Sequence, residues 1–474
     1  MKPLRAFAAL AAIALFFVCL HAPLAGAEVI ISEVDDRTAL ELTVYAQGLG
    51  LVREERAVQV EAGTHELRWS GAAARTLAGS ARVRAVPPAG GIAFLEQSFR
   101  YDPITPKALM DAHIARRVFV VSRDPSTGKE ERTAATLLSN EAEPVFEIGG
   151  EVTFGVEGRV VFPSIPADLF PSPTFVLLVE NSRPGARRLE ALYLTEGLGW
   201  SADYTLLLDE GAGTADLDCR ATVDNQSGAE FGGASLTLVA GDIQRAEGPQ
   251  PRAMAMAEGR RAAEGFREEA LFEYHAYSLD RKVELRDGEA KQLVLLSAEA
   301  VPVKTEYVFE SRPVYFAPVG PSPEEARHAS VFVEARNAPE AGLGVPLPAG
   351  VVRIYRRGPQ GGLAFVGEDF MPHLPAGSTM RLKAGEAFDL TGNRLQTSFT
   401  VLGKDAYEAS FRITLRSAKG EDAAVKVVED IPGDWEMVRS TLTYEKISAG
   451  RAAFHVRVPA GGEAALEYTV RVRH

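Results

Sequence analysis

Hydrophobic and polar residues alternate with a period of two along most of this chain, which is the pattern of β-strands with one buried face. Residues 217–223 place Leu, Cys, Ala and Val on one side and Asp, Arg and Thr on the other. Residues 411–415, 454–458 and 466–472 repeat the pattern. We therefore expect antiparallel strands that each have one hydrophobic and one solvated face.

Turn-forming residues separate these expected strands at short intervals. Glycine-containing turns are predicted at 61–63, 209–211, 286–288, 448–450 and 459–462. Many short strands without a regular alternation with helices favour sandwiches and barrels over a parallel α/β sheet. We predict a mainly β fold with several β-sandwich (immunoglobulin-like) units, a small β-barrel and few helices.

The clearest helical pattern begins with Thr105 as N-cap and Pro106 at the first helical position, and runs to about Arg117. A weaker helical pattern covers residues 323–328. Four apolar stretches follow the first helix, at 117–121, 135–138, 145–148 and 158–162. Their close spacing suits a small closed β-barrel.

A chain of more than 400 residues is too long for one hydrophobic core. We expect a signal peptide over residues 1–27, an amino-terminal β domain over 28–104, the short helix and small β-barrel over 105–170, and a long β-sandwich region over 171–474. Residues 246–269 are rich in Ala, Met, Gly and charged residues and poor in branched apolar ones. This composition predicts a flexible insertion.

The amino terminus has the organisation of a secretory signal peptide. Lys2 and Arg5 precede an apolar stretch over residues 6–20, and small residues follow at a suitable cleavage position. His21 and Pro23 interrupt the stretch before it reaches the ~20 residues that a membrane-spanning helix needs. We expect export to the periplasm or the extracellular space, and leave association with the outer membrane open.

Cleavage after Ala27 lowers the number of Lys and Arg residues from 51 to 49 against 64 Asp and Glu residues, which gives a net charge of −15. This balance argues against binding to nucleic acid. No later stretch predicts a transmembrane segment in the mature chain.

Cys219 would be the single remaining cysteine, so no internal disulfide is expected. Its place on the apolar side of a strand indicates a buried residue rather than a nucleophile.

The sequence contains no recognisable local motif for catalysis or metal binding. The histidines after residue 27 form no His-Glu-x-x-His motif and no Cys/His cluster. Asp216, Asp218 and Asp224 gather oxygen ligands in one region, but without the spacing of a calcium loop. Neither a Gly-x-Ser-x-Gly elbow nor a dinucleotide fingerprint is present. We predict no catalytic residue, no cofactor and no metal site.

The densest group of polar and aromatic residues follows the expected insertion. On a strand, Glu273, His275 and Tyr277 would lie on one face, where they could contact a ligand. The same pattern is also that of an ordinary amphipathic strand. These three residues are therefore weak candidates for ligand contact.

Six short sequence runs carry a resemblance to a known family. Residues 199–204 (Gly-Trp-Ser-Ala-Asp-Tyr), 223–228 and 236–243 resemble the bacterial family of unknown function catalogued as 4139, as do residues 272–277, 392–394 and 433–435. The likeness covers residues 171–474, and the first unit is similar to the amino-terminal domain often found in that family. It implies an exported, mainly β bacterial protein that works through its surfaces, and it brings no reaction or catalytic residue.

Together these features predict a binding or interaction protein of the cell envelope or periplasm. Its partner would be an envelope protein or a glycan, and an exposed sheet edge could provide the contact by strand addition. A structural spacer is one alternative. A hydrolase of envelope glycan or peptide, with two carboxylates as acid and base, is the other.

Overall fold

The computed structural model describes residues 28–87, 90–166, 169–209, 211–241, 266–271, 274–310, 318, 325–358 and 361–473. The expected signal peptide and most of the expected insertion lie outside these residues. The chain forms two compact units, in which segments distant in sequence come together. The first consists of Met1–Thr38, Glu55–Ala72 and Val83–Glu190, and the second of Ala39–Glu54, Ala73–Arg82 and Ala191–His474.

The first unit contains a four-stranded sheet with the order β1-β4-β12-β6. Its strands are β1 (Glu28–Ser32), β4 (Gly63–Ser70), β12 (Thr174–Asn181) and β6 (Ile92–Arg100). β1 runs parallel to β4, and the other pairs are antiparallel. Arg56 is fully buried there, where its guanidinium donates to Ser32 O at 2.7 Å and lies 4.3 Å from the Trp69 ring centroid.

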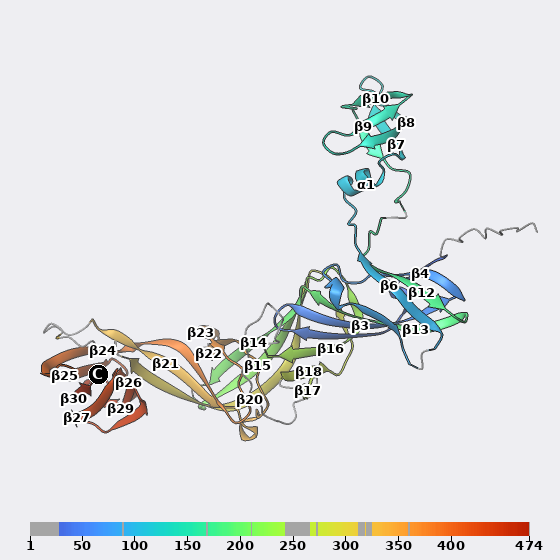
Figure 1. Ribbon diagram of the computed structural model, residues 1–474. Coiled ribbons are helices and arrows are strands. Elements are labelled where there is room, and N and C mark those ends of the chain that lie inside the picture. Colours follow the sequence, from blue (N-terminus) through green and yellow to red (C-terminus); the bar gives the residue numbers. More distant parts are fainter. Residues whose placement is uncertain are drawn as a thin grey trace, which may run out of the picture. The chain divides into compact units, whose positions relative to one another are not determined.

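The first unit also contains a five-stranded antiparallel sheet and the single α-helix of the described residues (Figure 1). The sheet has the order β10-β9-β8-β7-β11. These elements are α1 (Pro106–Ala112), β7 (Arg117–Arg123), β8 (Glu130–Ser139), β9 (Val145–Ile148), β10 (Glu151–Phe154) and β11 (Arg159–Val161).

The prediction of a small closed barrel in this region is wrong. The sheet is open and ends at β10 and β11, which have four and three residues. Met110 of α1 packs with Val118 and Phe146 in the core, so the helix covers apolar side chains that a closed barrel would enclose with strands. β10 was not predicted from the sequence, and it follows a tight turn at Gly149 and Gly150 with φ of 61° and 89°.

The helix begins as predicted, because the Thr105 side chain accepts a hydrogen bond from Ala108 N at 3.0 Å. It ends at Ala112, earlier than expected, since Ala115 has a positive φ of 60° and Ile114 forms a β-bridge with Leu137. The second helical prediction is wrong where the structure describes it, because Arg327 and His328 begin a strand.

An eight-stranded sheet has the order β17-β18-β16-β2-β3-β13-β5, and β19 pairs with β16. Its strands are β2 (Arg37–Tyr45), β3 (Leu49–Val60), β5 (Arg82–Ala85), β13 (Gly185–Glu196), β16 (Phe231–Ala240), β17 (Phe266–Leu271), β18 (Tyr274–Leu279) and β19 (Val283–Leu285). β16 runs parallel to β2, a strand almost 200 residues earlier in the chain.

The second unit contains a sheet of thirteen strands, with β23-β22-β14-β15-β20-β21-β24-β25-β30-β27 as its main path. Its strands are β14 (Leu198–Asp209), β15 (Thr214–Asn225), β20 (Glu289–Glu310), β21 (Arg327–Arg336), β22 (Gly350–Arg357), β23 (Leu363–Met371), β24 (Thr379–Gly403), β25 (Ala406–Ser417), β26 (Ala423–Asp430), β27 (Asp434–Ser440), β28 (Tyr444–Ser448), β29 (Arg451–Val458) and β30 (Glu463–Arg473).

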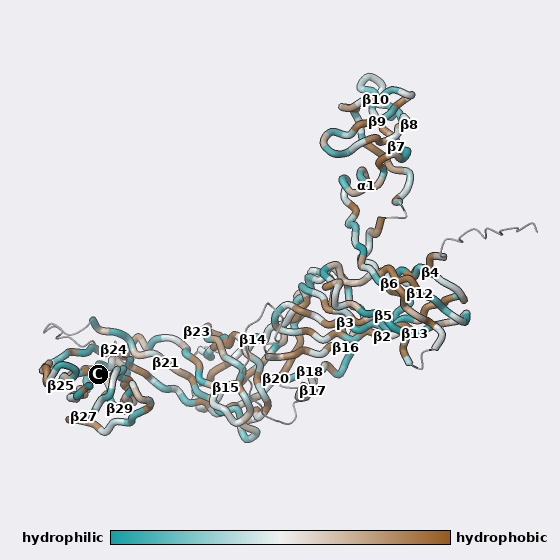
Figure 2. The backbone as a smooth tube through the Cα atoms, viewed as in Figure 1, coloured by the Kyte–Doolittle hydropathy of each residue, from teal (hydrophilic) through white to brown (hydrophobic). Residues whose placement is uncertain are grey.

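The carboxy-terminal strands form a sandwich of two layers. One layer contains β24, β25, β30 and β27, and the other contains β26, β29 and β28. Phe454 of β29 stacks on Tyr468 of β30 with ring centroids 5.5 Å apart, which places the two layers face to face. The alternation predicted for residues 411–415 and 466–472 is confirmed, since their apolar members belong to this core. Figure 2 shows hydrophobic and hydrophilic positions mixed along the backbone of the carboxy-terminal strands.

Short 3₁₀ helices occur at Val34–Asp36, Ala78–Ser80 and Pro339–Ala341. Within the described residues, no helix combines the length and the apolar character needed to cross a bilayer. The fold is thus mainly β with several sheets, as the sequence predicts.

Candidate functional site

His275 and Tyr277 lie two positions apart on β18, and both line one cavity of the second unit. β18 pairs with the end of β16, so that His275 stands opposite Ala240 and Tyr277 opposite Leu238. The third sequence candidate, Glu273, lies outside the described residues. The structure therefore brings together two of the three predicted residues.

This cavity, here called the β18 cavity, has a volume of about 210 Å³. Its walls come from the end of β16, from β18, from the segment before β22 and from the segment after β23. The lining residues are Ala240, Gly241, His275, Tyr277, Pro346, Leu347, His373, Leu374 and Pro375. None of them is Asp, Glu, Lys or Arg.

Main-chain hydrogen bonds join the two proline-containing segments of the wall. Leu347 and Leu374 form an antiparallel bridge in which each N–H donates to the other carbonyl at 2.9 Å. The Tyr277 hydroxyl donates to Pro346 O at 3.0 Å, and the residue is only 2% exposed. β18 and the two segments are thereby held as one structure.

Asn337 supports both segments from a fully buried position. Its side-chain amide donates to Val345 O at 2.8 Å and to Pro375 O at 3.1 Å, while its Oδ1 accepts from Gly344 N at 2.8 Å. A buried amide that satisfies main-chain groups of two loops fixes their conformation, because leaving those groups unpaired is costly. The wall of the cavity is therefore largely preformed.

His373 lies exposed at the edge of the cavity. Its Nδ1 accepts a hydrogen bond from Ala349 N at 3.1 Å, so the neutral ring carries its hydrogen on Nε2. The cavity thus combines apolar walls with two imidazole rings, and its lining contains no carboxylate, ammonium or guanidinium group. Such a surface can accept an apolar group and orient it with a few hydrogen bonds.

The cavity is smaller than the clefts of ~300–1,000 Å³ that usually hold drug-sized ligands. It exceeds the ~150 Å³ that is sufficient for a benzene ring in an engineered protein core. Its volume of about 210 Å³ therefore suits one large side chain or a single ring.

Trp200, part of the sequence run that carries the family resemblance, supports the cavity from the core. Its indole N–H donates to Val239 O at 3.0 Å, and its ring meets Tyr277 edge-on with centroids 6.3 Å apart. Trp200 is 5% exposed. It holds β18 in place and does not line the cavity.

Gly197, just before this run, and Asn225, in the run 223–228, have roles in folding. Gly197 has a φ of 77°, and a Cβ there would lie 2.5 Å from Gln226 O. Asn225 is fully buried, and its side chain donates to Ala229 O at 2.9 Å and accepts from the Ser227 hydroxyl at 2.7 Å. The motif that identifies the family is therefore a packing motif.

The sequence-based interpretation of Cys219 agrees with its position. The residue is fully buried, and burial raises the pKa of its thiol, although a hydrogen bond with Tyr204 opposes this. At neutral pH the group therefore stays a thiol and is a poor nucleophile.

The aspartates weighed as oxygen ligands have other partners. Asp218 pairs with Arg220 at 3.0 Å, and Asp216 accepts from Ala300 N at 3.0 Å. Among the described residues, no group of three or more His, Cys, Asp or Glu could hold a metal.

The buried ion pair of Arg394 and Glu429 is the most unusual charged group in the carboxy-terminal sandwich. Arg394 Nε donates to Glu429 at 3.1 Å, and both side chains are almost inaccessible. The Tyr468 hydroxyl also donates to Glu429, and burial together with this carboxylate raises the pKa of Tyr468 well above its usual value. The group lies between the layers of a packed core, so its role is structural.

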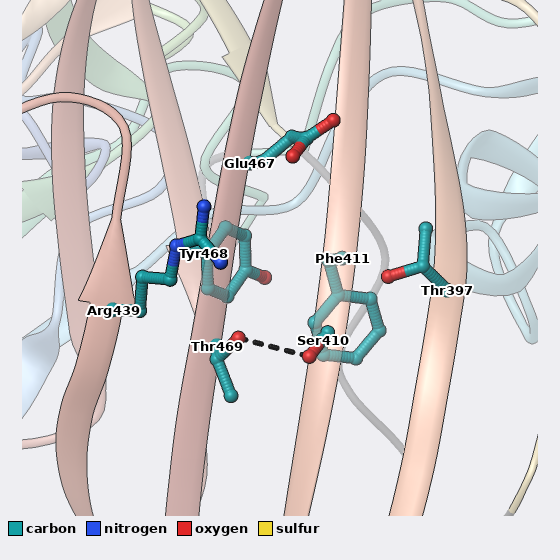
Figure 3. Close-up of a pocket in the computed structure, with 7 residues that line it drawn as sticks. All are labelled: Thr397, Ser410, Phe411, Arg439, Glu467, Tyr468 and Thr469. Carbon is teal, nitrogen blue, oxygen red and sulfur yellow. Dashed lines mark hydrogen bonds between the residues drawn. The ribbon is translucent and has the colours of Figure 1, made fainter.

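Two further cavities have different linings. A polar hollow of about 160 Å³ lies on the carboxy-terminal sheet and contains one carboxylate, Glu467 (Figure 3). A third cavity, of about 180 Å³, lies in the first unit beside Arg187 and Arg188, which bond to Asn181 at 2.9 Å and Glu55 at 2.6 Å. None of the three cavities brings two carboxylates together, so they give the hydrolase alternative no acid–base pair.

The two proline-containing walls of the β18 cavity were not predicted from the sequence. Two proline-bracketed stretches, 346–348 and 372–375, could have been recognised as ordered loops. Nothing in the sequence indicates that they meet each other or β18, because their contacts join positions about 25 to 100 residues apart.

The comparison with protein families supports the resemblance found in the sequence. Residues 189–474, more than half of the chain, match the family described as Domain of unknown function (DUF4139). The chain belongs to this family. A search of curated proteins finds no match.

Proposed function

We propose that this DUF4139 protein is an exported binding or interaction protein of the cell envelope, and that it holds a protein partner through the β18 cavity. The cavity of about 210 Å³, whose lining contains no Asp, Glu, Lys or Arg, is the observation that carries the proposal. A structural spacer needs no such cavity, and a carboxylate-based hydrolase needs charged groups that its lining does not offer.

The occupant that fits best is one large apolar side chain of a partner protein. Interfaces commonly depend on a few anchor residues that fill well-packed pockets. A wall that is preformed by Asn337 and Tyr277 lowers the entropy lost on binding. The signal-peptide pattern of residues 1–27 supports a site of action outside the cytoplasm.

Filling the cavity tests the proposal. In Ala240→Leu the added side chain would occupy the space, and in His373→Trp a large ring would cover its exposed edge. The tagged full-length protein would be cross-linked in its native envelope, purified and analysed by mass spectrometry. We expect both variants to lose a partner that the unmodified protein captures reproducibly.

Ala290→Leu is the matched control, because Ala290 is exposed on β20 and contacts no part of this cavity. It should retain the partner, and thermal unfolding should show that all variants fold. Retention of every partner by both cavity variants would contradict the proposal. It would direct attention to a sheet edge such as β10, where Val152 and Phe154 are 68% and 69% exposed.

A further inference from the structure

The outer face of the carboxy-terminal sheet carries a line of hydroxyl groups across three neighbouring strands. Thr397 of β24, Ser410 of β25 and Thr469 of β30 line the polar hollow, and we name these three residues the hydroxyl row (Figure 3). Ser410 stands opposite Thr469, and their hydroxyl oxygens are 2.9 Å apart. Thr397 belongs to a β-bulge, which places it beside Ser410.

Arg439 extends the row on the fourth strand, β27, opposite Thr469. Its side chain is exposed and lines the hollow (Figure 3). Within the described part of the chain, no carboxylate pairs with this guanidinium. An exposed arginine without a partner on a closely packed polar face is available to a ligand.

The other charged groups next to the row are already paired. Glu467 accepts from Arg412 at 2.7 Å on one side of the row, and Arg471 donates to Glu408 at 3.0 Å on the other. Because Arg412 balances Glu467, the guanidinium of Arg439 gives the hollow a net positive charge of one. Glu467 still has lone pairs that can accept hydrogen bonds.

This set of groups fits a ligand that combines one negative charge with several hydroxyls. Guanidinium groups bind carboxylates through two parallel hydrogen bonds. Ser and Thr hydroxyls both donate and accept, which matches the hydroxyls of a sugar ring. The volume of about 160 Å³ is sufficient for one six-membered ring.

We propose that the hydroxyl row and Arg439 bind an acidic sugar residue of the hexuronate type in a glycan. The sugar carboxylate would pair with Arg439, and its ring hydroxyls would bond to the row and to Glu467. This site shares no residue with the β18 cavity, so it goes beyond the proposed function and does not depend on it.

Calorimetric titration and saturation-transfer NMR on the whole protein test this proposal, with glucuronate, glucose and acetate as probes. We expect millimolar binding of glucuronate, and about tenfold weaker binding of both glucose and acetate, because each lacks half of the recognised groups. Arg439→Gln should weaken glucuronate binding about tenfold, since it removes a charge-assisted pair. Ser410→Ala with Thr397→Val should weaken it severalfold while leaving acetate unaffected.

Arg416→Gln is the matched control, because Arg416 is an exposed arginine of β25 that pairs with Glu463 at 3.2 Å outside the hollow. It should bind glucuronate as the unmodified protein does. Equal binding of glucuronate and acetate, with no effect of the hydroxyl variants, would show adventitious anion binding only. That result, or glucuronate binding that survives Arg439→Gln, would overturn the proposal.

Discussion

The β18 cavity and the hydroxyl row belong to the same compact unit but are built in different ways. The cavity collects four separate chain segments, two of them loops, around an apolar space. The hydroxyl row consists of neighbouring positions on adjacent paired strands whose opposite face is the sandwich core, with a β-bulge at Thr397. The row therefore depends on the pairing of neighbouring strands, whereas the cavity depends on a few hydrogen bonds between distant segments.

We expect the largest loss of stability from removing the buried Arg394 beneath the hydroxyl row. Arg394→Ala would leave Glu429 buried without its cation beneath the sheet that carries the row. Removing one partner of a buried ion pair costs about 3–5 kcal/mol, so the free energy of unfolding from urea titration should fall by that amount. Arg412→Ala, which breaks an exposed pair with Glu467, should cost less than about 1 kcal/mol. Equal losses would show that Arg394 adds nothing special to the core.

We expect a smaller loss of stability from removing Asn337, which holds the wall of the β18 cavity. Asn337→Ala removes the hydrogen bonds that the side chain makes with Val345, Pro375 and Gly344. Buried groups left without partners cost roughly 1–3 kcal/mol each, and relaxation of the loops should limit the total to about 3 kcal/mol. Urea titration measures the loss, and partner capture should fall with it. Asn140→Ala, which removes one exposed bond to Asp111, should change stability little. Unaltered partner capture by a folded Asn337→Ala protein would show that the wall need not be preformed.

The smallest expected effect concerns one hydroxyl. Tyr277→Phe keeps the ring beside Trp200 but removes the bond to Pro346 O. The carbonyl loses its partner, which should cost about 1 kcal/mol in the same titration. A loss as large as that of Asn337→Ala would mean that the tyrosine, rather than the asparagine, holds the proline-containing segments in place.

Much of this fold follows from local sequence patterns. The alternation at 217–223 predicts the buried side of β15, and the Thr105–Pro106 pair predicts the start of α1. The closed barrel was predicted wrongly because strand spacing does not say whether edge strands meet, and α1 covers the core instead. Pairing between β2 and β16, which are far apart in sequence, has no local signal.

The candidate site shows the same limit. His275 and Tyr277 could be selected because they share a strand face, yet His373 reaches the same cavity from another loop. The family motif around Trp200 proved to support the site rather than to form it. Sequence patterns identified the strand that carries the site, while the opposite wall depends on contacts that only the folded chain creates.

Photo-cross-linking from the edge of the β18 cavity is the decisive test of whether this cavity holds a protein partner. A benzophenone maleimide would be attached to His373→Cys, or to Thr397→Cys in the hydroxyl row, and Cys219 should not compete because it is buried. We predict that irradiation in the native envelope joins position 373 to one protein partner and that Ala240→Leu abolishes the adduct. No protein adduct from position 373, or equal adducts from 373 and 397, would contradict a binding role for this cavity.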